Sequence, residues 1–332
     1  MGKKSIVTIG GGTGHFVLLS GLKKYNIEIT AVVSMADDGG STGVLRDEMG
    51  VLPPGDIRQC LVALSEDSEM LRNLFSYRFE NGSLSGHTFG NLFLSALEKI
   101  NGNFLEGVKE ASKILRVRGR VLPVTEEQMH LLVTLKDGTE IEGERALDGD
   151  ERISKIGVQS VSLKENVNAY EPALKAIENA DSIVIGPGDL YGSLLTSLLI
   201  AEVSEAVKKS NARLIYIANL TNKKGQTDNF GIGEYVEAIE SYIGVGRIDT
   251  IISNNEMPSE DAVSAYEQQE GAGTVISCTG FIPDGGTKII CEPLLSHKKV
   301  NIPSSDKIKR DRSFIRHDSD ALARALMRHI EN

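Results

Sequence analysis

Short apolar runs alternate with helical spacing at the start of the chain. Lys4–Ile9 is rich in β-branched residues and runs directly into a cluster of glycines. Apolar residues then recur at helical spacing (Phe16, Leu19 and Leu22), and a second apolar run covers Glu28–Ser34. A strand, a turn, a helix and a second strand within about 30 residues form a βαβ unit, which builds a right-handed crossover in a parallel sheet. The N-terminal pattern therefore predicts an α/β fold with a mostly parallel sheet.

A series of helices is expected after the second strand. Prolines at 53 and 54 interrupt the chain, and Asp56 is placed to cap a helix that runs through Leu64. Helical spacing of apolar residues continues over three further segments: Glu69–Phe79, Phe89–Ile100 and Phe104–Leu115.

The pattern changes between Gly119 and Glu165. His130–Leu135 and Thr139–Gly143 are typical of two strands, and the Asp-Gly pair at 137–138 favours the primed turn of a tight hairpin. Lys155–Leu163 is typical of a third strand. We therefore predict a small β-rich insertion over residues 119–165, between core segments 1–118 and 166–332.

The α/β alternation returns after the insertion. We expect a helix from Glu171 and then a buried strand, Ser182–Ile185, which ends in Gly-Pro-Gly-Asp at 186–189. A long helix over Leu190–Lys208 is expected next. Two more apolar strands and a final helix complete the pattern: Arg213–Ala218, Asp249–Ser253 and Ser319–His329.

Composition narrows the classes of function. The chain of 332 residues carries 36 Lys and Arg against 46 Asp and Glu, a formal charge of -10, which argues against binding of nucleic acid. No apolar run reaches the roughly 18 residues that a membrane helix needs, and the N-terminus lacks the pattern of a signal peptide. Three cysteines without CxxC spacing argue against a disulfide framework or a zinc site. We therefore expect a cytoplasmic protein without a membrane span.

Two predicted strands end in glycine-rich turns that open helices, at Gly10–Gly14 and at Gly186–Gly188. Such a turn presents unpaired backbone N–H groups and the positive end of a helix dipole, and glycine lets a phosphate approach the backbone. Ser193, near the start of the second helix, could add a hydroxyl. Glycine could serve the geometry of a tight turn alone, but two such turns at the carboxyl edge of one sheet favour a ligand that carries a diphosphate.

The dinucleotide-binding fingerprint is incomplete. In the pattern G-x-G-x-x-G, the third glycine would fall on His15. About 20 residues later the second strand ends in Ser-Met at 34–35 instead of an acidic residue, and Asp37 and Asp38 come slightly too late. NAD is therefore only the second choice of nucleotide.

Polar side chains gather in the loop after the second strand. Asp37, Asp38 and Asp56 could hold Mg²⁺ together with ligand phosphates, or accept from a ribose or a base, while the alternative is ordinary turn and cap chemistry. Arg58 could fork onto a phosphate, whereas Asp56 is better explained as a helix cap. Asparagines at the ends of elements (91, 219 and 254) could read a base or a sugar edge, or serve in capping.

Five blocks in order carry a family resemblance: Gly-Gly-Thr-Gly at 11–14, Asp-Asp-Gly-Gly-Ser-Thr-Gly at 37–43, Pro-Pro-Gly-Asp-Ile-Arg at 53–58, Gly-His-Thr-Phe-Gly-Asn at 86–91 and Gly-Pro-Gly-Asp-Leu-Tyr-Gly-Ser at 186–193. Together with Arg-His-Asp at 316–318, they resemble the bacterial gluconeogenesis-factor proteins, relatives of the phospholactate transferase CofD. The resemblance covers nearly the whole chain.

The resemblance implies a Rossmann-like three-layer core with a small insertion. For gluconeogenesis factors it implies binding of a UDP-sugar, such as UDP-N-acetylglucosamine, and a role in carbon metabolism and cell shape. For the transferase it implies magnesium-dependent transfer of a phospholactyl group to a deazaflavin. One block departs: residues 219–229 read Asn-Leu-Thr-Asn-Lys-Lys-Gly-Gln-Thr-Asp-Asn, where the family usually has Asn-x-Met-Thr-Gln-Pro-Gly-Glu-Thr-Asp-Gly. The missing Glu weakens a catalytic interpretation more than a binding one.

We therefore interpret the chain as a regulatory protein that binds a nucleotide sugar, with phospho-group transfer and NAD binding as alternatives. No catalytic residue is assigned, and Mg²⁺ is expected at Asp37 and Asp38 if a reaction takes place. We also expect a regulatory protein partner and a homo-oligomer. The residues expected to bind the ligand are Gly11, Gly12, Thr13, Gly14, Asp37, Asp38, Gly40, Ser41, Arg58, His87, Asn91, Gly186, Gly188, Asp189, Ser193, Asn219, Asn254 and Arg316.

Overall fold

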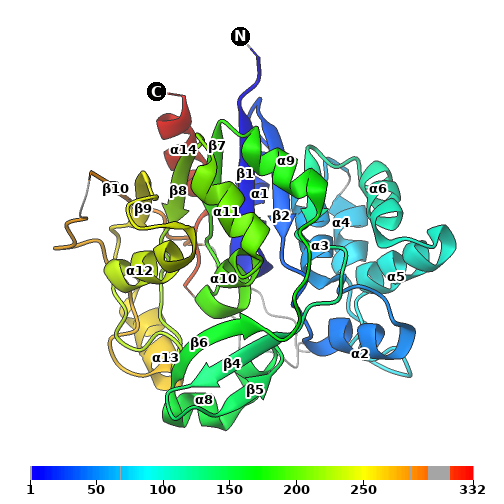
Figure 1. The fold of residues 1–332 in the computed structure, drawn as a ribbon, viewed down its shortest axis with the longest axis horizontal. Coiled ribbons are helices and arrows are strands. Elements are labelled where there is room, and N and C mark those ends of the chain that lie inside the picture. The colour runs from blue at the N-terminus through cyan, green and yellow to red at the C-terminus, as the bar shows by residue number, and fades with distance from the viewer. Residues whose placement is uncertain (1, 68, 284–285, 298–314, 332) are drawn as a thin grey trace.

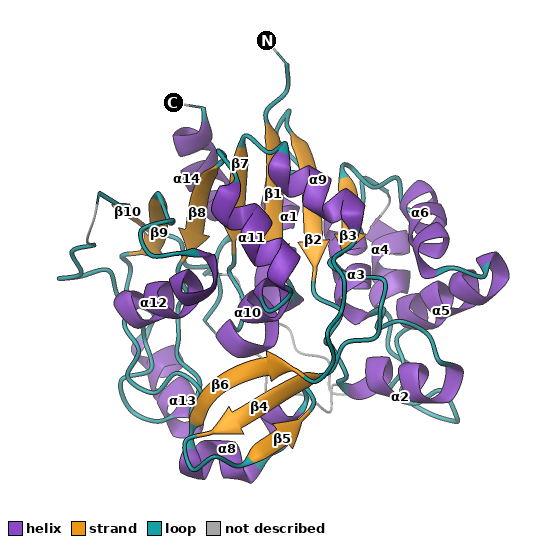
Figure 2. Ribbon diagram, viewed as in Figure 1, coloured by secondary structure: helices purple, strands orange, loops and turns teal. Residues whose placement is uncertain are grey.

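The computed structural model (Figures 1 and 2) describes residues 2–67, 69–283, 286–297 and 315–331. Its centre is a seven-stranded sheet in the order β10-β9-β8-β7-β1-β2-β3, in which all neighbouring strands are parallel. The predicted α/β fold with a mostly parallel sheet is confirmed. The strands of this sheet are β1 (Ser5–Gly10), β2 (Glu28–Val33), β3 (Arg120–Pro123), β7 (Ser182–Ile185), β8 (Arg213–Ile217), β9 (Thr250–Asn254) and β10 (Lys288–Glu292).

Helices cover both faces of this sheet (Figure 2). On one face α1 packs against α3 and α14, and on the other α11 packs against α9 and α12. The central strands bury nearly all their side chains because both faces are covered. The helices around the sheet are α1 (Gly12–Leu22), α2 (Gly40–Met49), α3 (Gly55–Leu64), α4 (Glu69–Ser76), α5 (Phe89–Asn101), α6 (Phe104–Ile114), α9 (Glu171–Glu178), α10 (Leu195–Leu198), α11 (Ala201–Lys209), α12 (Ile232–Ile243), α13 (Glu260–Glu270) and α14 (Ser319–Ile330).

A small antiparallel sheet lies below the carboxyl ends of the central strands (Figure 1). Its order is β5-β4-β6, formed by β4 (Leu131–Leu135), β5 (Glu140–Glu142) and β6 (Val158–Leu163). The predicted hairpin is confirmed, and the Asp137 carboxylate accepts a hydrogen bond from the Thr139 N–H at 2.9 Å within its turn. Two short helices, α7 (Ala146–Gly149) and α8 (Glu151–Ile156), connect β5 to β6.

The first strand of the predicted insertion belongs to the main sheet. Residues 120–123 lie inside the range 119–165, yet they form β3 and pair with β2 at the sheet edge. Pro123 is tolerated there because no further strand needs its missing N–H group. The small sheet starts only at Leu131, and Lys155, which we predicted to begin a strand, lies in α8.

The helix predicted over Leu190–Lys208 is interrupted. It consists of a π-helical turn, η1 (Leu190–Leu194), followed by α10 and α11. The Asp189 carbonyl accepts from the N–H groups of both Ser193 and Leu194, at 2.9 Å each, which widens the first turn. Among the described residues no single helix is long and apolar enough to cross a membrane, although the bent pair Leu190–Leu198 and Ala201–Lys209 passes the same test when taken together.

The cysteines differ from the expectation that no disulfide forms. Cys278 and Cys291 are bonded to each other, while Cys60 is buried and free. The two bonded residues are 13 positions apart and have no motif spacing, so the sequence pattern carried no sign of the bond.

Candidate functional site

A polar cavity of about 680 Å³ lies at the carboxyl edge of the main sheet, a size typical of small-ligand sites. Its walls come from the turn after β1, the loop into α2, the start of α3 and the turn after β7. Residues 131–163, which we call the small-sheet region, close the opposite side through α7 and α8. Segments around residues 219–226 and 315–317 complete the wall. The cavity therefore lies where ligands of open α/β sheets bind.

The first glycine turn opens α1 without a side-chain cap. Gly12 has a φ of +65°, and a Cβ at Gly11 would lie only 2.1 Å from the Asp56 carboxylate. The Gly12 N–H donates to that carboxylate at 3.0 Å, and the rest of the first helical turn lines the cavity. Because the first N–H groups of a helix have no partner within the helix, this turn can hold an anion.

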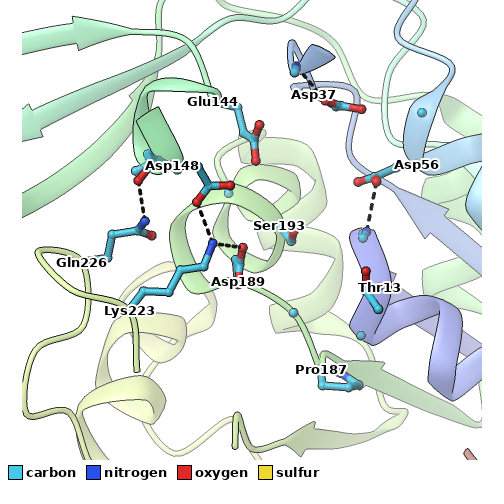
Figure 3. A pocket seen from close by; sticks show the side chains of 18 of the residues that line it. Thr13, Asp37, Asp56, Glu144, Asp148, Pro187, Asp189, Ser193, Lys223 and Gln226 are labelled. Atoms are coloured by element: carbon cyan, nitrogen blue, oxygen red, sulfur yellow. Dashed lines mark hydrogen bonds and ion pairs between the residues drawn. The ribbon is translucent and has the colours of Figure 1, made fainter. Parts of the chain in front are cut away.

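The second glycine turn lies directly against the first. A Cβ at Gly14 would come within 2.4 Å of the Pro187 carbonyl, so only glycine allows this approach. The Asn219 side chain fixes the turn by donating to the Gly188 carbonyl at 2.7 Å. Figure 3 shows Thr13 and Pro187 at the same end of the cavity, with Ser193 on the side toward Glu144. The two predicted turns therefore form one continuous site.

Three half-buried carboxyl groups face this site (Figure 3): Asp37, Asp56 and Glu144. Burial, together with repulsion from Asp37, raises the pKa of Asp56 to about 7. Burial also raises the pKa of Asp37, and it raises the pKa of Glu144 well above its usual range. Glu144 comes from the small-sheet region and reaches Gly192, where a Cβ would lie 2.9 Å from its carboxylate oxygen. The cavity thus combines an anion-binding turn with acidic groups that hold protons up to higher pH than usual.

A lysine joins the small-sheet region to the core. The Lys223 ammonium lies 2.7 Å from Asp148 and 2.5 Å from Asp189, as the dashed lines of Figure 3 show. Burial opposes its charged form, but the two carboxylates outweigh burial and raise the pKa of Lys223 well above its usual range. Close by, Gln226 donates to the Leu147 carbonyl at 2.8 Å. These contacts attach α7 of the small-sheet region to residues 223–226 and to the turn after β7.

Replacing Lys223 with methionine is expected to lower the free energy of unfolding by about 1–2 kcal/mol, because two partly buried carboxylates lose their counter-ion. Compared with the wild type, amide hydrogen exchange in Lys223→Met should accelerate more in α7 and α8 than in the strands of the main sheet. The control is Lys224→Met, since its backbone N–H donates to Glu270 and its side chain makes no hydrogen bond or ion pair with any residue that the structure describes. Equal exchange in the two variants would contradict the proposed role of Lys223.

A polar network connects three of the motif blocks. Arg58 donates to Asn91 at 2.8 Å, and Asn91 in turn donates to Ser41 at 3.3 Å. His87 lies behind Ser41, with 3.0 Å between its Nδ1 and the serine oxygen, and it does not line the cavity. The blocks 37–43, 53–58 and 86–91 therefore meet in space, with His87 as a support for Ser41.

Four of the expected ligand residues lie outside the cavity wall: Asp38, His87, Gly186 and Asn254. The Asp38 carboxylate accepts from the Arg145 N–H at 2.6 Å, so it points toward the small-sheet region. The Asn254 side chain, at the end of β9, accepts from the N–H of Glu256 and from the N–H of Leu294, which follows β10. Gly186, whose φ is +83°, shapes the second turn. The other expected residues line the cavity: Gly11, Gly12, Thr13, Gly14, Asp37, Gly40, Ser41, Arg58, Asn91, Gly188, Asp189, Ser193, Asn219 and Arg316.

Asp37 and Asp38 have different partners, since the Asp37 carboxylate accepts from the Gly39 N–H and the Asp38 carboxylate accepts from the Arg145 N–H. Within the described ranges, no group of three or more His, Cys, Asp or Glu side chains is arranged to hold a metal ion. That Asp37 and Asp38 hold a metal together stays a prediction. The prediction that Asp56 caps α3 is wrong: the cap residue is Pro54, and Asp56 instead accepts from Gly12. Asp56, not Asp38, is the second acidic residue of the site.

Sequence reasoning missed several site residues, among them Glu144, Asp148, Lys223 and His317. Asp56 was considered as a metal ligand but was assigned to a helix cap. His317 stands inside a motif block and could have been selected with it. Glu144 and Asp148 have no local signal, because they reach the cavity only through the position of the small sheet.

Comparisons with known proteins agree with these motifs. The family model for 2-phospho-L-lactate transferase CofD matches residues 6–295. This chain belongs to the CofD family. A protein of Halalkalibacterium halodurans named gluconeogenesis factor is 44% identical over 278 residues, which is 83% of this chain and 85% of that protein. The gluconeogenesis factor of Listeria monocytogenes is 40% identical over 261 residues, 78% of this chain and 80% of that protein.

The fold of the family is also known from experiment. The crystal structure of a UPF0052 family member from Bacillus halodurans has a TM-score of 0.87 and 38% sequence identity, covering 98% of this chain and 99% of that chain. This chain therefore has the fold of that UPF0052 family member, and its sequence is similar to those of the gluconeogenesis-factor proteins.

Proposed function

We propose that this protein binds a nucleotide sugar, of the UDP-sugar class, and acts as a regulatory protein in carbon metabolism and cell-shape maintenance. The observation that carries the proposal is the contact between the two glycine turns, where Gly14 lies against the Pro187 carbonyl. The turns offer backbone N–H groups to two successive phosphates, and the helix dipole of α1 favours their charge. A diphosphate satisfies both turns at once.

The acidic side chains of the cavity disfavour binding of a diphosphate that carries no metal ion. Asp37 and Asp56 are half-buried near the first turn, and their negative charge would repel the phosphates at a pH where they are ionised. Mg²⁺ fits this donor set, because it binds through one or two carboxylates plus phosphate oxygens and keeps its remaining waters. Asp37 and Asp56 would hold the ion, which would neutralise the diphosphate. We therefore propose that binding depends on Mg²⁺.

Binding is favoured over catalysis by one observation in the departing block. Gln226 stands where the family resemblance places a Glu, and its buried amide donates to the Leu147 carbonyl at 2.8 Å. A carboxylate cannot donate this hydrogen bond. The residue in this chain therefore serves to attach the small-sheet region, and an acid that a reaction could use is absent at that position.

The expected result is saturable binding of UDP-N-acetylglucosamine in the presence of Mg²⁺, measured by calorimetry and thermal unfolding. A ligand at 100 times its dissociation constant should raise the free energy of unfolding by about 2.7 kcal/mol. UDP-glucose, NAD and a magnesium-free sample with chelator complete the panel. Unchanged melting with every nucleotide at millimolar concentration would refute the proposal.

Phospho-group transfer is the second candidate, since the matching family model is named for a phospholactate transferase. It is tested in the same samples by following the nucleotide with phosphorus NMR. Magnesium-dependent consumption of a phosphorylated substrate would favour the transferase, whereas retention of intact nucleotide would favour the binding protein.

A further inference from the structure

A disulfide bond attaches an irregular segment to the edge of the main sheet. Cys278 lies in the stretch that follows α13, and Cys291 lies on β10, the last strand in the sheet order. Residues 271–281 form neither a helix nor a strand of either sheet. The bond therefore fixes a segment that regular secondary structure does not fix.

This segment packs behind one wall of the cavity. The Asn222 N–H donates to the Thr274 carbonyl at 2.7 Å, and the Ile276 N–H donates to the Leu220 carbonyl at 2.9 Å. An antiparallel bridge joins the two residues that lie between these bonds. Leu220 and the residue after it line the cavity, so the segment supports the wall from outside.

The supported wall makes further contacts inside the cavity. The Thr221 hydroxyl donates to the Tyr266 hydroxyl of α13 at 3.1 Å, and both residues line the cavity. Lys223, two positions further along, forms its ion pair with Asp148 of α7. A shift of the wall would therefore change the cavity on more than one side.

The bond is accessible from the edge of the sheet. Cys278 is buried, but Cys291 is only half-buried, and in the part of the chain that the structure describes β10 has a neighbouring strand on one side only. The two cysteines are 13 positions apart, and closing so short a loop constrains the unfolded chain less than closing a long one. Exposed disulfides are the labile and regulatory ones, whereas fully buried structural bonds resist reduction.

We propose that the Cys278–Cys291 pair is a redox switch that sets the affinity of the cavity for its ligand. In the oxidised form the bond holds residues 274–276 against 220–222, so the wall is ordered before the ligand arrives. In the reduced form binding must itself order the wall, and the affinity falls. The inference rests on the proposed function, because it describes the regulation of the same site.

The chemical step is an exchange with a dithiol. A thiolate of the dithiol attacks the sulfur of Cys291, the bond between the two cysteines breaks, and Cys278 leaves as a thiolate that takes up a proton. The second thiol of the reagent then attacks the mixed disulfide and releases Cys291 as a thiol. Two electrons and two protons pass from the dithiol to the protein, and the dithiol becomes a disulfide.

The test equilibrates the full chain in mixtures of reduced and oxidised dithiothreitol. Alkylation of the unfolded chain should find three thiols in the reduced protein and only that of Cys60 in the oxidised protein. Calorimetry with UDP-N-acetylglucosamine and Mg²⁺ should give about fivefold or more tighter binding to the oxidised form. Because such coupling is reciprocal, saturating nucleotide should raise the ratio of reduced to oxidised reagent at half-reduction by the same factor.

Hydrogen exchange measures the order of the wall without any ligand. Reduction should accelerate exchange of the N–H groups of Asn222 and Ile276, whose hydrogen bonds join the segment to the wall. Exchange in β1 and β7, at the centre of the sheet, should not change.

Variants separate the bond from the presence of thiols. Cys291→Ser cannot form the bond, so it should bind the nucleotide like the reduced wild type and should not respond to the reagent. Cys60→Ala is the matched control, because Cys60 is buried and free and its loss leaves the pair intact. This control should respond like the wild type. Should Cys291→Ser fail to fold, the oxidised and reduced wild type decide the question without a variant.

The outcomes are distinct. Equal affinity of the oxidised and reduced wild type would overturn the inference while leaving nucleotide binding intact, and so would three thiols in every oxidising mixture. If neither form binds a nucleotide, the proposed function fails, and hydrogen exchange then decides the switch by itself. Faster exchange at Asn222 and Ile276 after reduction would support it, and unchanged exchange would overturn it.

Discussion

Replacing Gly12 with valine is expected to abolish nucleotide binding while leaving the protein folded. Gly12 has a φ of +65°, and the atom nearest to a Cβ at this position would be the Ser193 oxygen at 3.9 Å, so a side chain would point into open cavity space. That space is where a phosphate must approach the backbone N–H groups. Loss of this approach should weaken binding of UDP-N-acetylglucosamine by more than about 100-fold, since several charge-assisted hydrogen bonds are lost together.

The variant also strains the backbone, which the control must reproduce. An L-residue in the left-handed region costs about 1–2 kcal/mol. Gly102, which follows α5 and has a φ of +70° with nothing within 4 Å, offers the same strain outside the cavity wall. Gly102→Val should therefore show a similar loss of stability and wild-type affinity. If Gly12→Val binds the nucleotide as tightly as Gly102→Val, the first turn has only an architectural role.

The regular part of the fold is readable from local pattern. β1 and its glycine turn, and the hairpin around Gly138, were predicted because strand period and turn chemistry act within a few residues. The membership of β3 in the main sheet was not predictable in this way. Its four residues pair with β2 after a separation of about 90 positions, and nothing in their own sequence distinguishes them from the strands of the small sheet.

The candidate site likewise has one part that the local sequence predicts and one part that it does not. The glycine turns follow from local sequence, since a strand that ends in glycines before a helix dictates both the turn and its position at the carboxyl edge. Glu144 and Lys223 become site residues only because the small-sheet region packs against the loop at Gly225. There a Cβ would lie 2.2 Å from the Ile153 carbonyl, and the Gly225 carbonyl accepts from Val158 at 2.7 Å. Such long-range packing has no period that a sequence pattern could show.

The error at Asp56 has a local cause. We expected Asp56 to be the cap residue of α3, but the cap residue is Pro54 and the helix begins at Gly55. This shift places Asp56 inside the first helical turn, where its carboxylate faces the Gly12 N–H instead of its own helix. A displacement of two residues therefore changes a capping side chain into a side chain of the site.

Replacing Asp56 with asparagine is expected to stabilise the ligand-free protein at neutral and alkaline pH. The pKa of Asp56 is raised from 3.8 to about 7, mainly by burial and then by the charge of Asp37. Between these two pKa values the folded state holds a proton that the unfolded state has lost, so stability falls as the pH rises through this range. The variant removes this loss, which is on the order of 2–4 kcal/mol at a pH above 7.

Denaturant unfolding from pH 4 to pH 8, with chelator present, measures the effect. The wild-type free energy of unfolding should decline with rising pH, and the Asp56→Asn curve should be flatter. The asparagine oxygen can still accept from Gly12, so the glycine turn keeps its geometry. Asp38→Asn is the control, because Asp38 points away from the cavity and its asparagine can still accept from Arg145.

The same two variants also test the metal-binding role of Asp56. Mg²⁺ should enhance nucleotide binding in Asp38→Asn but much less in Asp56→Asn. Parallel pH curves for wild type and Asp56→Asn would mean that this buried carboxyl group is not the one that retains its proton, and an undiminished Mg²⁺ effect would remove it from the metal-binding pair.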